Sequence, residues 1–167
     1  ISGPGAVLNN VANVLTLGGS NTYTGGTTIN GGRLVGPPGA IRGNMTIGSG
    51  AVLEIQPGPT PAVYSGAIGG SGLLLVSGGG ELTLAPTGAG NTFTSAQVTG
   101  ATLVRGAGAA ISGDVQLGPT ATLVIDEPGT AVFSRALSGT GTFLKDGTGT
   151  LSLTGNNAGF AGGSARV

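Results

Sequence analysis

The side chains that could do chemistry in this chain are six carboxylates, because the sequence contains neither histidine nor cysteine. Paired carboxylates can hydrolyse glycosidic bonds, one acting as the acid and the other as the nucleophile or base. Only Asp126 and Glu127 are adjacent, and they directly precede Pro128-Gly129, a sequence typical of a turn. We therefore expect this pair to lie in a solvated turn, and we expect the chain not to be an enzyme. The other carboxylates are single: Glu54, Glu81, Asp114 and Asp146.

Motifs for other reactions and ligands are incomplete. A Ser-His nucleophile requires an imidazole, which this chain lacks. Residues 69–72 (Gly-Gly-Ser-Gly) fit a β-turn better than a nucleophile elbow. Residues 145–149 contain one Asp, whereas calcium-binding solenoids carry their acidic motif in tandem. The G-K-[ST] end of a phosphate-binding loop does not occur. We expect no catalytic residue, no cofactor and no metal.

Composition limits the partners and the fold. The 167 residues include 37 glycines and nine prolines, but 38% are hydrophobic and the net charge is zero, so the chain can bury a core if the glycines form turns. The six basic residues are scattered, which argues against nucleic acid and against an anionic membrane surface. The longest apolar run is residues 73–76, far too short to span a bilayer. Because the chain begins with Ile1 and carries no signal peptide, we expect residues 1–167 to be one β-helical segment of a longer protein.

The sequence repeats itself. Residues 44–55 (NMTIGSGAVLEI) return as 114–125 (DVQLGPTATLVI), and residues 64–82 return as 133–151, so two long segments recur at nearly the same displacement. Within this repeat unit an apolar residue, a Gly-rich turn and a second short apolar strand recur at a period of about 20 residues, which is typical of a β-solenoid. The recurring first members and second members are Ile1/Val7, Ile29/Leu34, Ile47/Leu53, Ile68/Leu74, Val98/Leu103, Leu117/Leu123 and Leu137/Phe143.

The fold expected from this pattern is all-β, a right-handed parallel β-helix (β-solenoid) of about seven coils, built from two copies and more of a three-coil unit. Ile29, Ile47 and Ile68 should stack in one column, and Leu34, Leu53 and Leu74 in another. The three longest intervals between first members should each hold an extra strand, at residues 15–17, 82–84 and 151–153.

Recurring aromatic residues and threonines could form binding surfaces. Tyr23, Phe93 and Phe160 recur at equivalent places, either as a platform for sugar or as plugs of the core. Equivalent aromatics should be three coils, or about 14 Å, apart, which favours the plug. Thr-x-Thr pairs would order water only if they occupied one position in successive coils, and we expect that they do not.

Residues 15–34 (LTLGGSNTYTGGTTINGGRL) resemble the autotransporter-associated β-strand repeat, also called the passenger-associated transport repeat. A looser copy covers residues 82–103, and residues 151–167 keep only Leu151, Leu153, Gly155 and Phe160. The motif residues, to which the resemblance assigns a structural role, are Asn21, Thr22, Tyr23, Gly25, Thr27, Ile29, Gly32, Leu34, Asn91, Thr92 and Phe93.

The resemblance implies a β-helical stalk in the passenger of an autotransporter, exported across the outer membrane of a Gram-negative bacterium and displayed at the cell surface. The alternatives are an adhesin or a self-assembling filament that binds host or matrix through loops such as residues 35–44 and 56–63, and, more remotely, a polysaccharide-cleaving enzyme. The expected partners are flanking β-helix coils of the same chain or end-to-end copies. A surface or matrix ligand is a further candidate, whereas nucleic acid and direct membrane insertion are not expected.

Overall fold

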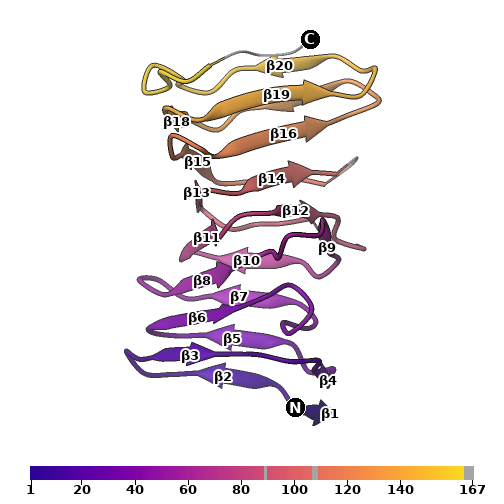
Figure 1. Ribbon diagram of the computed structural model, residues 1–167, viewed down its shortest axis with the longest axis vertical. Helices are drawn as coiled ribbons and strands as arrows, with labels where there is room; N and C mark the ends of the chain where they lie inside the picture. The colour runs from indigo at the N-terminus through magenta and orange to yellow at the C-terminus, as the bar shows by residue number, and fades with distance from the viewer. Residues whose placement is uncertain (89, 107–108, 164–167) are drawn as a thin grey trace.

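The computed structural model describes residues 1–88, 90–106 and 109–163, and it is a parallel β-helix of about seven turns. The turns stack along the long axis, with β1 and β20 near opposite ends (Figure 1). All strand pairs in the described ranges are parallel, and each joins two segments that lie one turn apart in the chain. None of the described residues forms a helix that could cross a membrane.

Each turn crosses three faces in a fixed order, called here faces 1, 2 and 3. The strands of face 1 form one sheet of two strands and one of five: β1 (Ser2–Gly3) and β4 (Thr22–Tyr23), then β9 (Ala62–Tyr64), β12 (Glu81–Leu84), β14 (Thr102–Arg105), β16 (Thr122–Asp126) and β19 (Thr142–Asp146). Face 2 also has two sheets: β2 (Val7–Asn9), β5 (Thr27–Ile29), β7 (Met45–Ile47) and β10 (Ile68–Gly70), then β17 (Ala131–Phe133) and β20 (Leu151–Leu153). Face 3 is one continuous sheet: β3 (Val14–Thr16), β6 (Arg33–Gly36), β8 (Val52–Ile55), β11 (Leu73–Ser77), β13 (Ser95–Thr99), β15 (Asp114–Leu117) and β18 (Leu137–Gly139).

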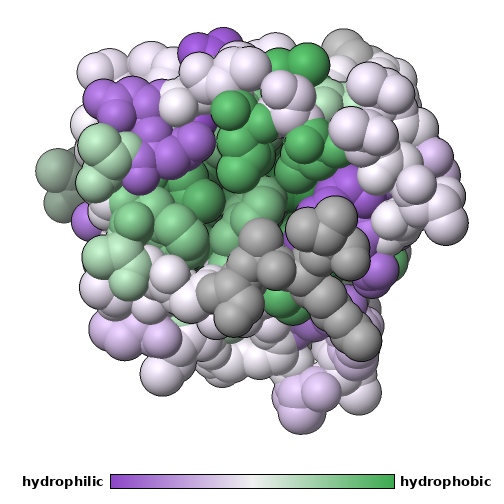
Figure 2. Space-filling model, turned by 90° about the horizontal axis from the view of Figure 1, so that it is seen from above, coloured by the Kyte–Doolittle hydropathy of each residue, from purple (hydrophilic) through white to green (hydrophobic). Residues whose placement is uncertain are grey.

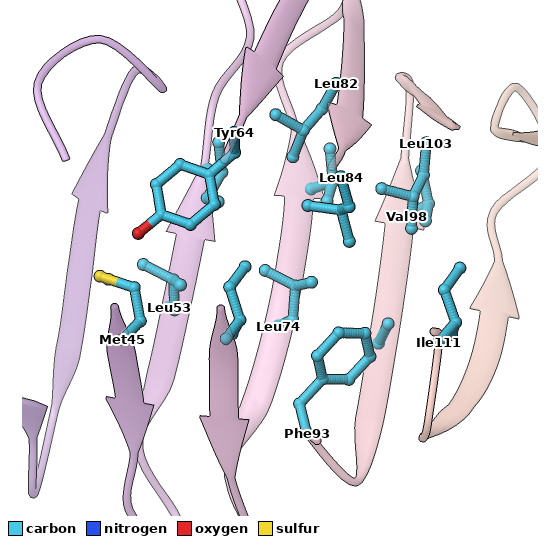
Figure 3. Close-up of a cluster of buried hydrophobic side chains, with 14 of the residues drawn as sticks. Met45, Leu53, Tyr64, Leu74, Leu82, Leu84, Phe93, Val98, Leu103 and Ile111 are labelled. Carbon is cyan, nitrogen blue, oxygen red and sulfur yellow. The ribbon is translucent and has the colours of Figure 1, made fainter. Parts of the chain in front are cut away.

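The core is a set of inward columns along the axis. On face 3 alternate residues point inward, and strand pairing places each inward residue on its counterpart in the turn below. Side chains from the three faces meet in the centre, where most are fully buried (Figure 3). No turn could bury its inward residues alone, so the stack is the unit of stability. The longest column runs through Leu15, Leu34, Leu53, Leu74, Ala96, Val115 and Leu137.

The expected columns are confirmed in part. Ile29 pairs with Ile47, and Leu34, Leu53 and Leu74 stack in order. The pairing of Ile47 with Ile68 is wrong, because Ile47 lies beside Gly70 and Ile68 lies beside Met45. The corner between β10 and β11 has two fewer residues than the corner below it, so β10 slides by two positions while β11 keeps its register.

The repeat unit of the sequence spans three turns and one further face, not three turns. β7 and β8 lie on faces 2 and 3, whereas their sequence copies, β15 and β16, lie on faces 3 and 1. The segments predicted as extra strands are therefore ordinary members of the stack: β12 continues face 1, and β20 pairs with β17. Consequently Leu103 does not lie on Leu74 but on Leu82, one face further around the axis.

Glycines with positive φ mark the corner that begins each unit. Gly3, Gly70 and Gly139 have φ values of 100°, 106° and 96°. A Cβ atom on Gly70 would lie 2.1 Å from the carbonyl oxygen of Ile47, and one on Gly139 would lie 2.0 Å from that of Leu117. The turn below thus approaches too closely for any side chain.

We expect Gly139→Ala to lower the free energy of unfolding by about 2 kcal/mol or more, because both the backbone conformation and the close carbonyl oppose a methyl group. Urea unfolding followed by circular dichroism would measure this loss. Gly58→Ala is the matched control, since Gly58 is exposed, lacks a positive φ and has nothing within 4 Å of an added Cβ. Equal midpoints for the two variants would contradict the assigned corner geometry.

Candidate functional site

The motif asparagine Asn21 joins three successive turns. Its side chain is 4% exposed, and its Oδ1 accepts a hydrogen bond of 2.7 Å from the amino group of Ile1 in the turn below. Its Nδ2 donates a hydrogen bond of 2.7 Å to the carbonyl of Ala40 in the turn above. One amide side chain therefore ties the backbones of both neighbouring turns, an arrangement called here the asparagine clamp.

Asn91 forms the same clamp in the second copy. Its Oδ1 accepts a 3.0 Å hydrogen bond from the N–H of Ile68, and its Nδ2 donates a 3.2 Å bond to the carbonyl of Ala110. In both clamps the upper acceptor lies 19 residues after the asparagine. The clamps are buried, so they exchange hydrogen bonds inside the protein rather than with water.

Asn157 forms the lower half of a third clamp and is not among the predicted motif residues. Its Oδ1 accepts a 3.0 Å hydrogen bond from the N–H of Leu137, the counterpart of Ile1 and Ile68. The signal that could have found it is the spacing of 20 residues from Leu137, the same as from Ile1 to Asn21. One extra residue before Phe160 hid this equivalence.

The motif aromatics cover the positive-φ glycines of the turn below. Tyr23 is the register partner of Gly3, and Phe160 forms a bridge with Gly139. Phe93 occupies the same place on face 2 and is fully buried beside Leu74 and Ile111 (Figure 3). Each aromatic thus lies above a corner glycine and not in the place of its missing side chain, because a Cβ atom on Gly70 or Gly139 would meet the turn below. These positions agree with the expected core plug: Tyr23 and Phe93 are buried, and Phe160 is half-buried.

The hydroxyl groups of the two buried tyrosines both have hydrogen-bond partners. The hydroxyl of Tyr23 lies 2.8 Å from Oγ1 of Thr27, a motif residue that is 3% exposed, and it accepts a 3.0 Å hydrogen bond from the N–H of Arg42. Tyr64, in β9, donates to the carbonyl of Gly43. Burial raises the pKa of Tyr64, and nearby Tyr23 adds to this effect, so Tyr64 stays a hydrogen-bond donor at neutral pH.

The other motif residues have packing roles or lie at the surface. Ile29 and Leu34 are fully buried in the columns. A Cβ atom on Gly25 or on Gly32 would clash with backbone atoms of the first turn. Thr22 and Thr92 have exposed side chains, while their N–H groups each donate a 2.8 Å hydrogen bond to the turn below. The motif therefore organises the backbone and gathers no reactive groups.

The three clamps lie on different faces. Asn21 sits over Ile1 on face 1, Asn91 over Ile68 on face 2, and Asn157 over Leu137 on face 3. The advance of one face per unit causes this rotation. The motif aromatics therefore cannot form one platform, whatever their axial separation.

The expectation of a solvated Asp126-Glu127 turn is wrong for Glu127. Its carboxylate is buried and lies 2.7 Å from Nη2 of Arg105, an inward residue of β14. Asp126 points outward and pairs in register with Asp146 of the next turn. The two acids thus face opposite sides of the wall and cannot share a substrate.

Glu54 is also buried, although it stands on the outward side of face 3. It is 3% exposed and is covered by Arg33, Gln56 and Ser77, each of which donates a hydrogen bond to it. Within the ranges that the structure describes, no three metal-ligating side chains come together.

Two shallow grooves lie on the outside of the helix. The groove on face 1 holds about 390 Å³, and its floor is formed by Thr83, Val104, Val124 and Leu144 of successive strands. Charged residues surround this floor: the acidic Glu81, Asp126 and Asp146, and the basic Lys145. The groove on face 3 is lined by both polar and apolar residues, including Gln97, Gln116 and Leu73.

One member of two Thr-x-Thr pairs recurs in successive turns. Thr122 and Thr142 are register partners, so these two threonines occupy one position on face 1. The column continues down to Thr102 and ends at Glu81, and its threonines are half-buried. It is one residue wide, which fits ordinary strand surface.

We expect Asn91→Asp to lower the free energy of unfolding by about 2 to 3 kcal/mol at neutral pH, because a buried carboxylate would face the carbonyl of Ala110. The loss should shrink as the pH falls towards about 4, where the protonated acid can again donate. Denaturant unfolding across this pH range would measure both effects.

The control for this variant is Asn44→Asp. The Oδ1 of Asn44 likewise accepts a 3.0 Å hydrogen bond from an N–H of the next turn, that of Ala67, but the side chain is exposed. A loss of equal size at Asn44 would mean that the donor half of the clamp contributes nothing.

We expect Glu127→Ala to cost about 3 to 5 kcal/mol, because it leaves Arg105 buried without its carboxylate. The double variant Arg105→Met/Glu127→Leu should recover most of this stability, which thermal unfolding would measure. A double variant no more stable than Glu127→Ala would show that the pair does more than neutralise two buried charges.

The passenger-associated-transport-repeat family model matches residues 12–35 and 143–165. The first match contains the clamp of Asn21 with Tyr23, and the second contains Asn157 with Phe160. The copy at residues 82–103 lies outside both matches, although Asn91 makes a complete clamp. No curated protein and no solved structure matches the chain significantly. The chain therefore carries two passenger-associated transport repeats, the repeat of autotransporter passengers, at residues 12–35 and 143–165.

Proposed function

We propose that this chain is a non-enzymatic stalk segment of an autotransporter passenger, which holds other parts of the protein away from a Gram-negative cell and assists its own export. Its repeats and its β-solenoid fold fit a structural domain of such a passenger, and the repeat family implies an exported, surface-displayed protein. The observation that carries the proposal is the uninterrupted face 3 sheet, which runs through seven turns without a break in its inward column.

Rigidity follows from the stacking. Neighbouring strands lie about 4.8 Å apart, so the stack of turns is a rod roughly 35 Å long. Every turn is joined to the next by backbone hydrogen bonds on more than one face, and each complete clamp joins a turn to both neighbours. A rod of this kind can hold its two ends apart without a partner protein.

The short sequence separation between contacting strands favours export. Because paired strands lie one turn apart in the chain, each turn can pack as soon as the following turn emerges from a pore. A clamp needs one turn before it and one after it, so it closes only when three turns have formed. Folding on the outside would then oppose backward sliding of the chain.

The loops proposed as adhesin contacts differ in their exposure. Residues 35–44 pack back onto the rod: Ala40 and Ile41 are buried, and the carbonyl of Ala40 completes the Asn21 clamp. Deletion of residues 36–43 would test adhesion separately from folding only if this loop did not contact the core. Because the loop packs on the core, the deletion would also damage the fold. Residues 58–61 are exposed, and Val63, which follows them on face 1, is 65% exposed.

Adhesion is the second candidate function, and the groove on face 1 is the observation that favours it. Val63 lies next to Thr83 in the outward column that forms the groove floor. Residues 58–63 and this groove together make a largely apolar strip whose edges carry three acidic residues and one lysine, which suits a partner with apolar and basic groups.

Display on cells would test the stalk proposal. The chain should be placed between an N-terminal epitope and a translocator barrel in a Gram-negative host, and epitope exposure should be measured by antibody binding to intact cells. We expect efficient display with the intact chain. We expect at least a several-fold loss with Gly139→Ala, whose last turns fold poorly.

Gly58→Ala serves as the control and should display normally. Equal display from an unfolded Gly/Ser-rich spacer of the same length would contradict a role for folding in export. If cells carrying the intact chain bind a surface or matrix, and Val124→Glu abolishes that binding without reducing display, adhesion rather than spacing would be the function.

A further inference from the structure

Asn44 begins the one Asn-x-Ser/Thr tripeptide of the sequence, Asn44-Met45-Thr46. None of the other eight asparagines has a serine or threonine two residues later. This tripeptide, the sequon, is the acceptor at which a sugar is attached to the amide of an asparagine on the surface of exported proteins. Asn44 belongs neither to the clamps nor to the repeat motif, so the sequon is a separate feature of the chain.

The fold places the two reactive members of the sequon on the outside of face 2. Met45 is 2% exposed and points into the core, whereas Asn44, directly before β7, and Thr46, within it, are both exposed. Because alternate residues of a strand point to the same side, the amide and the hydroxyl lie on one side of the wall. The sequon therefore presents to solvent the two groups that sugar attachment requires and keeps its variable residue in the core.

Hydrogen bonding divides the amide of Asn44 into an anchored oxygen and an available nitrogen. Its Oδ1 accepts a 3.0 Å hydrogen bond from the N–H of Ala67 in the turn above. Among residues 1–88, 90–106 and 109–163, none accepts a hydrogen bond from its Nδ2. A sugar is joined to Nδ2, so its attachment leaves the oxygen and the bond to Ala67 in place.

The residues above and below the sequon are short. Register on face 2 places Thr28 beside Thr46 in the turn below and Gly69 beside it in the turn above. The residues that precede the two register partners of Met45 are Gly26 and Ala67, so Asn44 also has a small neighbour on each side. None of these side chains is long enough to cover the amide, which leaves room for a sugar ring on the wall.

We propose that Asn44 is a site of N-linked glycosylation, at which a transferase attaches a hexose, or an oligosaccharide that begins with one, from a donor activated by a diphosphate. The Nδ2 atom forms a bond to the anomeric carbon of the sugar, while the bond from this carbon to the donor's phosphate oxygen breaks. The diphosphate leaves with that electron pair. One proton of Nδ2 passes to a base of the transferase, and the other stays on the glycosylated amide.

The attachment has to precede the stacking of this turn. β7 lies between β5 and β10, the N–H of Met45 donates a 2.8 Å hydrogen bond to the carbonyl of Ala67, and the carbonyl of Asn44 accepts a 2.9 Å bond from the N–H of Thr27. A transferase must hold the backbone of the acceptor tripeptide in its own cleft, and in the folded rod these bonds already occupy that backbone. This order rests on the export proposed above, in which the chain folds only outside the cell.

A sugar would supply hydration that the charges of this chain do not. The sequence has six basic and six acidic residues among 167, and its net charge is zero, a condition that promotes association between copies. Seen from one end, the rim of the rod is mostly pale, the colour of residues of intermediate hydropathy (Figure 2). Sugar hydroxyl groups on face 2 would make this wall more soluble without adding charge.

Mass spectrometry of the protein isolated from the cells that naturally produce it would test the proposal. We expect the fragment that contains Asn44 to carry the added mass of a sugar on this residue, and the other asparagines to be unmodified. The mass of a single hexose would identify a sugar nucleotide as the donor, and that of a preassembled oligosaccharide would identify a lipid-linked donor. An unmodified Asn44 in this protein would overturn the proposal.

Coexpression of the chain with a sequon-specific asparagine glucosyltransferase, which uses UDP-glucose, would test the acceptor and the order of events. We expect coexpressed wild type to carry glucose at Asn44, and the folded, purified chain to be modified at least about tenfold less by the same enzyme, because local opening must first expose the backbone. Thr46→Val should abolish the modification and Thr46→Ser should retain it, while circular dichroism shows the same fold for both. Asn30 is the internal control, since it is exposed but is followed by Gly31-Gly32, and it should stay unmodified.

The glucosylated chain should unfold at the same temperature as the unmodified chain, because Oδ1 keeps its bond to Ala67. A glucosylated chain that does not fold, or a Thr46→Val variant modified as fully as wild type, would overturn the proposal, and equal modification of the folded and the coexpressed chains would overturn the order. Failure here is distinguishable from failure of the stalk function. Normal surface display with an unmodified Asn44 would reject only the glycosylation, and failed display of a chain modified at Asn44 would reject only the export role.

Discussion

Register between successive turns is the constraint on which the rest of this structure depends. A short strand directs only about two side chains into the core, and it buries them only when the strands above and below present their own inward residues at the same height. The glycines at the corners serve this requirement, since Gly70 and Gly139 let one turn lie against the carbonyl groups of another. The motif aromatics lie above these corner glycines, where Tyr23 and Phe93 are buried in the core.

The length of the repeat unit determines how the clamps and motif aromatics are distributed around the rod. An exact three-turn unit would place all clamps, corner glycines and motif aromatics in one line along the rod. The extra face distributes them instead around the axis, so that each of the three faces receives one clamp. A rod reinforced in this way resists opening from any side, which suits a spacer better than a binding surface.

The sequence predicted the fold class and the first columns, because a short, regular period of alternating strands and Gly-rich turns admits few other architectures. It did not predict on which face each strand lies. All three faces show the same alternation of inward and outward residues, so Val98 and Leu103 are equivalent by pattern to Ile68 and Leu74 although they lie one face further around. Corner lengths decide this, and the slide of β10 by two positions shows how a short corner alters register. The burial of Glu127 could not be predicted either, because its partner Arg105 lies 22 residues away in the sequence and nothing in the local pattern links the two.

The rotation of the repeat by one face can be tested with cysteine pairs, since the chain contains no cysteine of its own. Leu75 and Gln97 are outward register partners on face 3, whereas Val104 stands on face 1. The Cα atoms of such partners lie about 5 Å apart, within the range that a disulfide spans. The account predicts that Leu75→Cys/Gln97→Cys forms an intramolecular disulfide readily under mild oxidation and that Leu75→Cys/Val104→Cys does not. Efficient cross-linking of the second pair and not of the first would contradict it, because Leu103 would then lie on Leu74 and the unit would span three turns.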